Sequence, residues 1–135
     1  MILFYDACAV IYQVESKAPW VQRLQALGVR TRASDPDAKI AVSALSLMEC
    51  RVEPLREGDR RRLRLFDEFF ALQGLVIAGL DAGVLERAAI LRAQTSLRTP
   101  DAIQAACALS LPGEVKFLTN DAAFRRVSGL SVVLV

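Results

Sequence analysis

Residues 97–109 read Leu97-Arg98-Thr99-Pro100-Asp101-Ala102-Ile103-Gln104-Ala105-Ala106-Cys107-Ala108-Leu109, and this stretch predicts a helix with a marked start. Thr99 suits the N-cap, where its hydroxyl would accept an orphan backbone N–H, and Pro100 suits the first helical position. Asp101 follows in the first turn, where the helix dipole favours a negative charge. The rest is small and apolar on nearly every side, which indicates a buried helix. Asp101 therefore either stabilises the helix N-terminus or binds a metal ion there.

Outward from this helix, short apolar runs alternate with helical patterns along the 135 residues. The expected strands are residues 2–5, 40–42, 74–78, 115–118 and 131–135. The expected helices are residues 7–14, 19–27 closed by Gly28, a segment capped by Ser43, 59–72, a segment starting at Asp81, and 122–126, with turns in 31–38. Pro54 and Gly58 are expected to break the chain before residue 59. The alternation predicts an α/β fold with a parallel sheet and helices on both faces, and the length indicates a single domain over residues 1–135.

Composition excludes several classes of site. The chain has no histidine, which removes His-based catalytic triads, histidine general bases and HExxH zinc sites. Its three cysteines, Cys8, Cys50 and Cys107, are far apart, so neither a disulfide framework nor a zinc cluster is expected. The net charge of +2 is too small to indicate a nucleic-acid ligand by itself. No signal peptide and no membrane-length apolar run is visible, which leads us to expect a cytoplasmic protein.

Four acidic residues share a position relative to the predicted elements: Asp6, Glu49, Asp101 and Asp121. Each has a local structural role open to it, because aspartates cap helices and residues 46–49 fit the S-x-x-E capping box. Together, however, each lies at the end of a strand or near the start of a helix that follows one, and these points face the same edge of a parallel sheet. Clustered carboxylates repel unless cations neutralise them, and oxygen-only ligands suit Mg²⁺ or Mn²⁺. The corresponding chemistry is metal-assisted attack of water on a phosphodiester.

The segments around these acids resemble, in order, the four motif regions of a PIN domain, especially those of bacterial VapC-type toxins. They are Asp6 after residues 2–5, residues 42–49 ending at Glu49, residues 98–103 around Asp101, and residues 117–124 around Asp121. The resemblance implies a three-layer α/β/α fold whose five-stranded parallel sheet has the order 3-2-1-4-5. It implies a magnesium-dependent endoribonuclease toxin, with Mn²⁺ able to substitute, that cleaves RNA, is neutralised by a cognate antitoxin, and is usually a homodimer. It assigns metal-site roles to the four acids and gives Thr119 the hydroxyl that positions the fourth acid or its water.

The first motif departs from the family pattern. PIN domains often carry Ser, Thr or Asn within two residues after the first Asp, whereas this chain has Ala7 and Cys8, and a thiol is a weak hydrogen-bond donor. A haloacid dehalogenase-type phosphatase would need a second Asp at position 8, and a receiver domain would need paired acids early in the chain. The remaining alternative is a PIN-like RNA-binding or housekeeping RNA-processing protein outside any toxin–antitoxin pair.

Two features bear on partners. The predicted helix 59–72 carries two apolar stripes, residues 63, 66 and 70 and residues 65, 69 and 72. One stripe would cover the sheet, and the second would be either a partner surface or a face wrapped by the protein's own chain. RNA entering an acidic pocket needs basic neighbours, and the arginines without an obvious core role are Arg51, Arg56, Arg60, Arg61, Arg98, Arg125 and Arg126.

Overall fold

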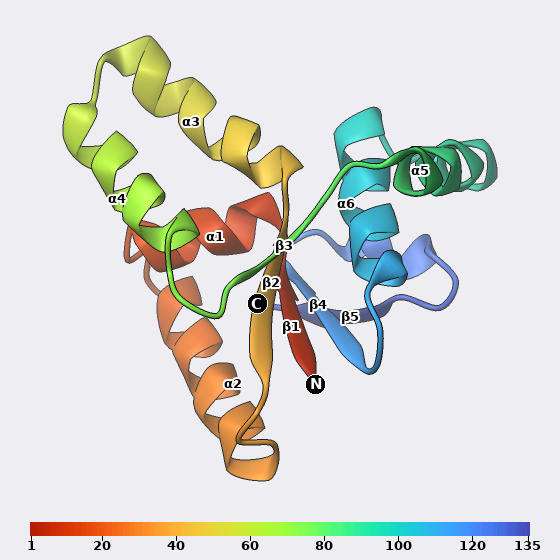
Figure 1. Cartoon of the computed structure of the whole chain (residues 1–135), viewed down its shortest axis with the longest axis horizontal. Helices are drawn as coiled ribbons and strands as arrows, with labels where there is room; N and C mark the ends of the chain where they lie inside the picture. Colours follow the sequence, from red (N-terminus) through yellow and green to blue (C-terminus); the bar gives the residue numbers. More distant parts are fainter.

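The structure, a computed structural model, describes all residues 1–135 and has three layers, with helices on both faces of one sheet (Figure 1). The strands are β1 (Ile2–Tyr5), β2 (Lys39–Ser43), β3 (Val76–Ala78), β4 (Val115–Thr119) and β5 (Ser131–Leu134). The helices are α1 (Ala7–Val14), α2 (Trp20–Ser34), α3 (Leu45–Glu57), α4 (Arg60–Phe70), α5 (Ala82–Gln94), α6 (Thr99–Ser110) and the short 3-10 helix η1 (Ala122–Arg126). None of the helices has both the length and the apolar character that a bilayer crossing requires.

The five strands are all parallel and lie in the order β3-β2-β1-β4-β5, so the predicted topology is confirmed. β1 is central: Tyr5 is in register with Val42 of β2 on one side and with Leu118 of β4 on the other. Because parallel strands share one direction, the residues that follow Tyr5, Leu118 and Val42 emerge at the same edge of the sheet. This edge is where ligands bind in open α/β folds.

A separate apolar core covers each face of the sheet, as expected when strands are apolar on both sides. On one face α5 and α6 pack on Phe117, whose ring stacks on Phe4 at 5.4 Å and lies 4.6 Å from Phe124 of η1. On the other face α1, α2, α3 and α4 pack around side chains that include Phe66 and Phe69. Figure 1 shows the α3–α4 hairpin and the α5–α6 pair on opposite sides of the strands.

Several predicted helix ends were wrong. α2 does not stop at Gly28 but continues to Ser34, because Thr31 extends the buried face that begins at Val21. Pro54 does not break the chain and lies inside α3, whereas Gly58 does end that helix, with a left-handed φ of 65°. A buried apolar face can therefore carry a helix through residues that locally favour a break.

Of the two alternatives for the second apolar stripe on helix 59–72, the structure supports the one in which the protein's own chain covers it. Phe66 and Phe69, one from each stripe, are both buried. On α3, Met48, Val52 and Leu55 follow one another at helical spacing and are 59%, 42% and 63% exposed. Leu72, just beyond the end of α4, is 54% exposed.

Arg62 fastens the α3–α4 hairpin to the rest of the domain. Its guanidinium lies 3.1 Å from Glu15 at the end of α1, and 2.9 Å and 3.6 Å from Glu57 and Glu53 of α3. Asp59 caps α4 by accepting the backbone N–H of Arg62. These contacts hold α3, the helix that carries Glu49, in a defined orientation.

Candidate metal centre

Asp6 stands at the carboxyl end of β1 and is held by neutral donors. Its carboxylate accepts the backbone N–H of Ala7 at 2.7 Å, which caps α1, and the hydroxyl of Thr119 at 2.9 Å from the end of β4. Asp6 is 9% exposed and Thr119 is fully buried. The pairing of β1 with β4 brings the two residues together, although they are 113 positions apart in the sequence.

The pKa of Asp6 is raised from 3.8 to about 6, chiefly by burial. The hydrogen bonds from Thr119 and Ala7 oppose this rise, and the negative charges of Glu49 and Asp101 contribute to it. The carboxylates of Glu49 and Asp101 are therefore electrostatic neighbours of Asp6, as the common sheet edge predicts. No cationic side chain forms an ion pair with Asp6. Its charge thus lacks a counter-ion within the chain.

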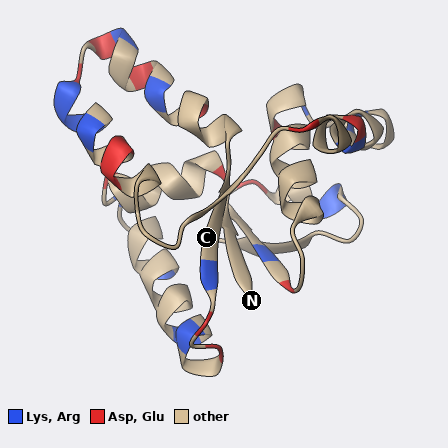
Figure 2. Cartoon of the chain, in the orientation of Figure 1, with Lys and Arg blue, Asp and Glu red and all other residues tan.

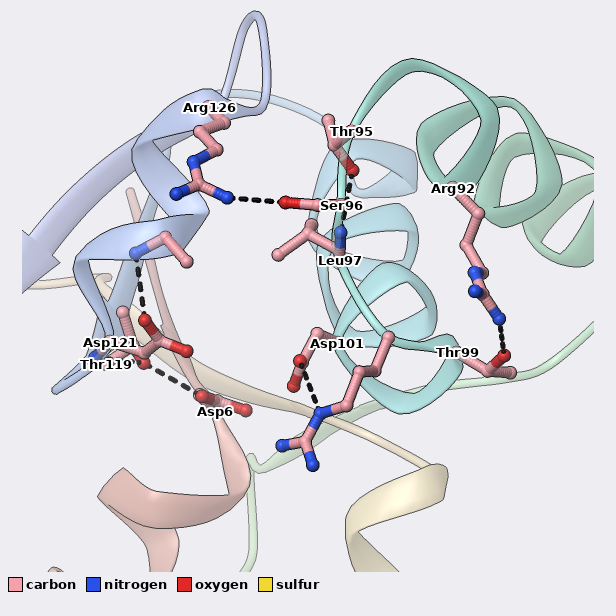
Figure 3. Close-up of polar contacts among 12 residues, drawn as sticks. Asp6, Arg92, Thr95, Ser96, Leu97, Thr99, Asp101, Thr119, Asp121 and Arg126 are labelled. Atoms are coloured by element: carbon pink, nitrogen blue, oxygen red, sulfur yellow. Dashed lines mark hydrogen bonds and ion pairs between the residues drawn. The ribbon is translucent and has the colours of Figure 1, made fainter.

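Asp121 is linked to this carboxylate through Thr119. Its backbone N–H donates to the Thr119 hydroxyl at 3.1 Å, and its carboxylate accepts the N–H of Ala123 at 2.9 Å as the N-cap of η1. Asp121 therefore both caps a helix and lies at the site. Figure 3 shows Asp6, Asp101 and Asp121 arranged around one space, with Thr119 between Asp6 and Asp121.

Asp101 lies in the first turn of α6, and the helix is buried as predicted. Thr99, however, is not its N-cap: the cap is Arg98, which makes no side-chain capping bond, and the Thr99 hydroxyl accepts from Arg92 of α5 at 2.6 Å (Figure 3). The Arg98 guanidinium is 3.7 Å from the Asp101 carboxylate and is 87% exposed. Because the arginine of this pair is exposed and 3.7 Å away, Asp101 remains able to bind another cation.

Glu49 comes from α3, where the predicted capping box is wrong. The helix already begins at Leu45, whose N–H donates to Ser43, so Ser46 lies within the helix. Ser46 and Glu49 instead both accept hydrogen bonds from the side-chain amide of Gln104, at 3.0 Å and 2.8 Å. Gln104 was missed by the sequence reasoning. The available signal was an uncharged polar residue, one turn after Asp101, in a helix otherwise buried and apolar.

Cys8 occupies the place where the resemblance leads one to expect a hydroxyl or amide side chain. Its sulfur is 3.7 Å from the Asp6 carboxylate and 3.8 Å from the Thr119 hydroxyl. Burial and, to a smaller extent, the charge of Asp6 raise the pKa of the thiol to about 11, so Cys8 is a neutral thiol. Thr119 therefore supplies the strong donor to Asp6 that Cys8 does not.

Hydrogen bonds link Asp6, Thr119 and Asp121, and the charges of Glu49 and Asp101 act on Asp6, but these residues do not form a ready-made coordination shell. No three His, Cys, Asp or Glu side chains are close enough to constitute one. The donors are carboxylates and a hydroxyl, with a buried carboxylate that has no counter-charge, which is a set that fits a hard divalent cation such as Mg²⁺.

Known proteins share this fold. The structure is similar to VapBC2 from Rickettsia felis bound to a DNA fragment from its promoter, with a TM-score of 0.76, 18% identity, and coverage of 99% of this chain and 98% of that one. It is also similar to a toxin–antitoxin complex from Klebsiella pneumoniae, with a TM-score of 0.68, 24% identity, and coverage of 97% and 95%. A search of curated protein sequences gave no significant match. The family model of the PIN domain matches residues 3–130, and the chain therefore belongs to the PIN domain family.

Proposed function

We propose that this protein is a magnesium-dependent endoribonuclease toxin, with Mn²⁺ able to substitute, that is neutralised by a cognate antitoxin in the bacterial cytoplasm. The main observation behind the proposal is the buried carboxylate of Asp6 at the carboxyl edge of the sheet, which has no ion-pair partner. The negative charges of Glu49 and Asp101 act on it. Membership of the PIN family, a family of nucleases, supports the activity. Structural similarity to toxin–antitoxin complexes supports the biological role.

In this proposal each site residue has a separate role in cleaving the phosphodiester. Asp6 and Asp101 bind the cation, while Glu49 and Asp121 complete the site or orient the attacking water. Thr119 fixes the Asp6 carboxylate and the backbone of Asp121 through its single hydroxyl. When bound, a divalent cation lowers the pKa of water and stabilises the leaving oxygen.

RNA must approach this acidic edge past basic residues. Arg98 borders Asp101, and Arg125 follows Asp121 in η1 and is exposed, so both are suited to contact phosphate. Arg56, Arg60 and Arg61 gather instead where α3 leads into α4 (Figure 2). That turn lies two helical turns or more beyond Glu49, roughly 10–15 Å along α3, so these residues are better placed for solvent or a partner.

An antitoxin is the proposed protein partner, and a second copy of the chain is the other. The exposed stripe of Met48, Val52 and Leu55 runs along the same helix as Glu49. An amphipathic segment laid on this stripe would end near the acidic site. There an Arg or Lys of the antitoxin could pair with Asp6 and Asp101 in place of the metal, since buried carboxylates need a cation.

The test is cleavage of single-stranded RNA with Mg²⁺ or Mn²⁺ by the wild type, Asp6→Asn and Asp101→Asn. Cleavage should be lost in both variants while their folds persist by circular dichroism. Undiminished cleavage by either folded variant would contradict the assignment. For the toxin role, induced expression in a bacterial host should arrest growth, and co-expression of the adjacent small gene should restore it. Equal growth with wild type and Asp6→Asn would favour the alternative, a PIN-like RNA-binding or housekeeping RNA-processing protein.

A further inference from the structure

Gln104 is a buried polar residue for which the proposed mechanism has no role. It lies on α6, one turn after Asp101, and is 1% exposed. Its amide nitrogen donates to Ser46 and to the Glu49 carboxylate, both on α3. These two bonds connect the helices that carry the two helix-borne acids of the site.

In the Gln104 side chain, the amide nitrogen is fully hydrogen-bonded whereas the oxygen has no partner, which is unusual for a residue that only supports packing. The amide NH₂ group has two hydrogens, and Ser46 and Glu49 use both. The side-chain oxygen of Gln104 is buried and has no hydrogen-bond partner. A buried unpaired carbonyl is unfavourable, so an apolar side chain would suit the packing better. What the amide supplies in return is a hydrogen bond to a charged carboxylate, which is stronger than one between neutral groups.

We infer that Gln104 is a positioning residue that fixes the carboxylate of Glu49 for metal binding, an inference that rests on the proposed function. The amide holds the Oε1 atom of Glu49 at 2.8 Å and leaves Oε2 for the cation or its water. Because the amide is neutral, it orients Glu49 without cancelling the negative charge that a divalent cation needs. Ser46, fully buried in the previous turn of α3, fixes the orientation of the amide in turn.

The test compares Gln104→Met in two backgrounds, the wild type and Glu49→Gln. Methionine keeps the length and apolar volume of the side chain but removes both hydrogen bonds. The readout is Mn²⁺ affinity, measured by electron paramagnetic resonance of free Mn²⁺, together with the Mn²⁺ concentration that gives half-maximal RNA cleavage. Loss of such a supporting contact typically weakens metal binding roughly 10- to 100-fold. We expect about a tenfold loss for Gln104→Met in the wild type and no further loss in Glu49→Gln.

Ser46→Ala is the matched control, because it removes the other hydrogen bond of the same amide and leaves the one to Glu49. Its Mn²⁺ affinity should fall less than that of Gln104→Met. An equal loss for Gln104→Met in both backgrounds would mean that the residue supports packing only, and would overturn the inference. Unaltered affinity in the wild-type background would overturn it as well. Absence of Mn²⁺ binding by the wild type itself would overturn the proposed function and this inference together.

A second measurement decides the matter if Gln104→Met does not fold. The side-chain NH₂ resonances of Gln104 can be followed by nuclear magnetic resonance in metal-free wild type and in Glu49→Gln, with Ser46→Ala as the reference. We expect slowly exchanging NH₂ protons in the wild type, and a shift with faster exchange when the charged acceptor is lost. Resonances that are the same in wild type and Glu49→Gln would show that the contact does not form, and would overturn the inference.

Discussion

Replacing Asp6 with Asn should stabilise the metal-free protein at neutral pH. Burial, reinforced by the charges of Glu49 and Asp101, raises the pKa of Asp6 from 3.8 to about 6. Each pKa unit corresponds to about 1.4 kcal/mol, so keeping Asp6 ionised in the folded chain costs up to about 3 kcal/mol. Asparagine avoids this cost and keeps the shape of the side chain. Its oxygen can accept the N–H of Ala7, and its NH₂ group can donate to the hydroxyl of Thr119.

The effect has a defined dependence on pH. The pKa of Asp6 is higher in the folded chain than in the unfolded chain, so between pH 3.8 and about 6 the folded state binds more protons. The contribution of Asp6 to the free energy of unfolding therefore falls as the pH rises through this window. Below it the wild type and Asp6→Asn should be nearly equal, and above about pH 6 the variant should be more stable by the full amount.

The assay is urea unfolding of both proteins between about pH 4 and pH 8 in the presence of a chelator. Asp81→Asn is the control, because Asp81 is an exposed N-cap of α5 and asparagine caps helices equally well. At about pH 7.5, Mn²⁺ should stabilise the wild type and so narrow or reverse the difference in free energy of unfolding between Asp6→Asn and the wild type. A ligand at about 100 times its Kd stabilises the folded state by about 2.7 kcal/mol. A wild type more stable than Asp6→Asn at this pH without metal, or a difference that does not change with pH, would refute the reasoning.

The strand-borne half of the site could be predicted from the sequence. Asp6 and Asp121 each follow an apolar run, and the rule that parallel strands end at one edge of the sheet places them together without knowledge of any side-chain contact. The pairing of β1 with β4, which brings Thr119 to Asp6, needs the strand order, and that came from the family resemblance.

The site residues on α3 and α6 were harder to predict from the sequence, because local sequence patterns favoured a helix-capping role for them over a role at the site. Residues 46–49 match a capping box, yet α3 starts earlier and turns both side chains toward α6. Which residue of α6 meets Glu49 depends on how the two helices lie across the sheet, and periodicity within one helix does not report this. Gln104 is therefore visible only in the folded chain. The same dependence on tertiary packing accounts for the wrong helix ends at Gly28 and Thr99, where packing overrides local preference.

Three further results are expected. Neutralising Arg98 and Arg125 together should weaken RNA binding and reduce its salt dependence in a filter-binding assay without altering Mn²⁺ affinity, and unaltered RNA affinity would remove their role. Phe124→Ala should lower the free energy of unfolding by about 3–5 kcal/mol in urea melts, because Phe124 is buried against Phe117 and anchors η1. Gly58→Ala should cost about 1 kcal/mol or somewhat more, since φ is 65° and no atom lies near an added Cβ, whereas Gly58→Asn should cost less.

The way the acids are held connects stability with function. Thr119, the backbone N–H of Ala7 and Gln104 are all neutral donors, and the one cation paired with a site acid, Arg98, is largely exposed. The chain thus fixes the directions of its carboxylates without neutralising them, and the burial of the Asp6 charge, together with its acidic neighbours, raises the energy of the metal-free fold. A cation that enters would offset this cost, whether it is a divalent metal or a basic side chain of a partner. The metal and the antitoxin would then bind the same uncompensated carboxylates, so binding of one should exclude binding of the other. Asp6→Asn should weaken the binding of both.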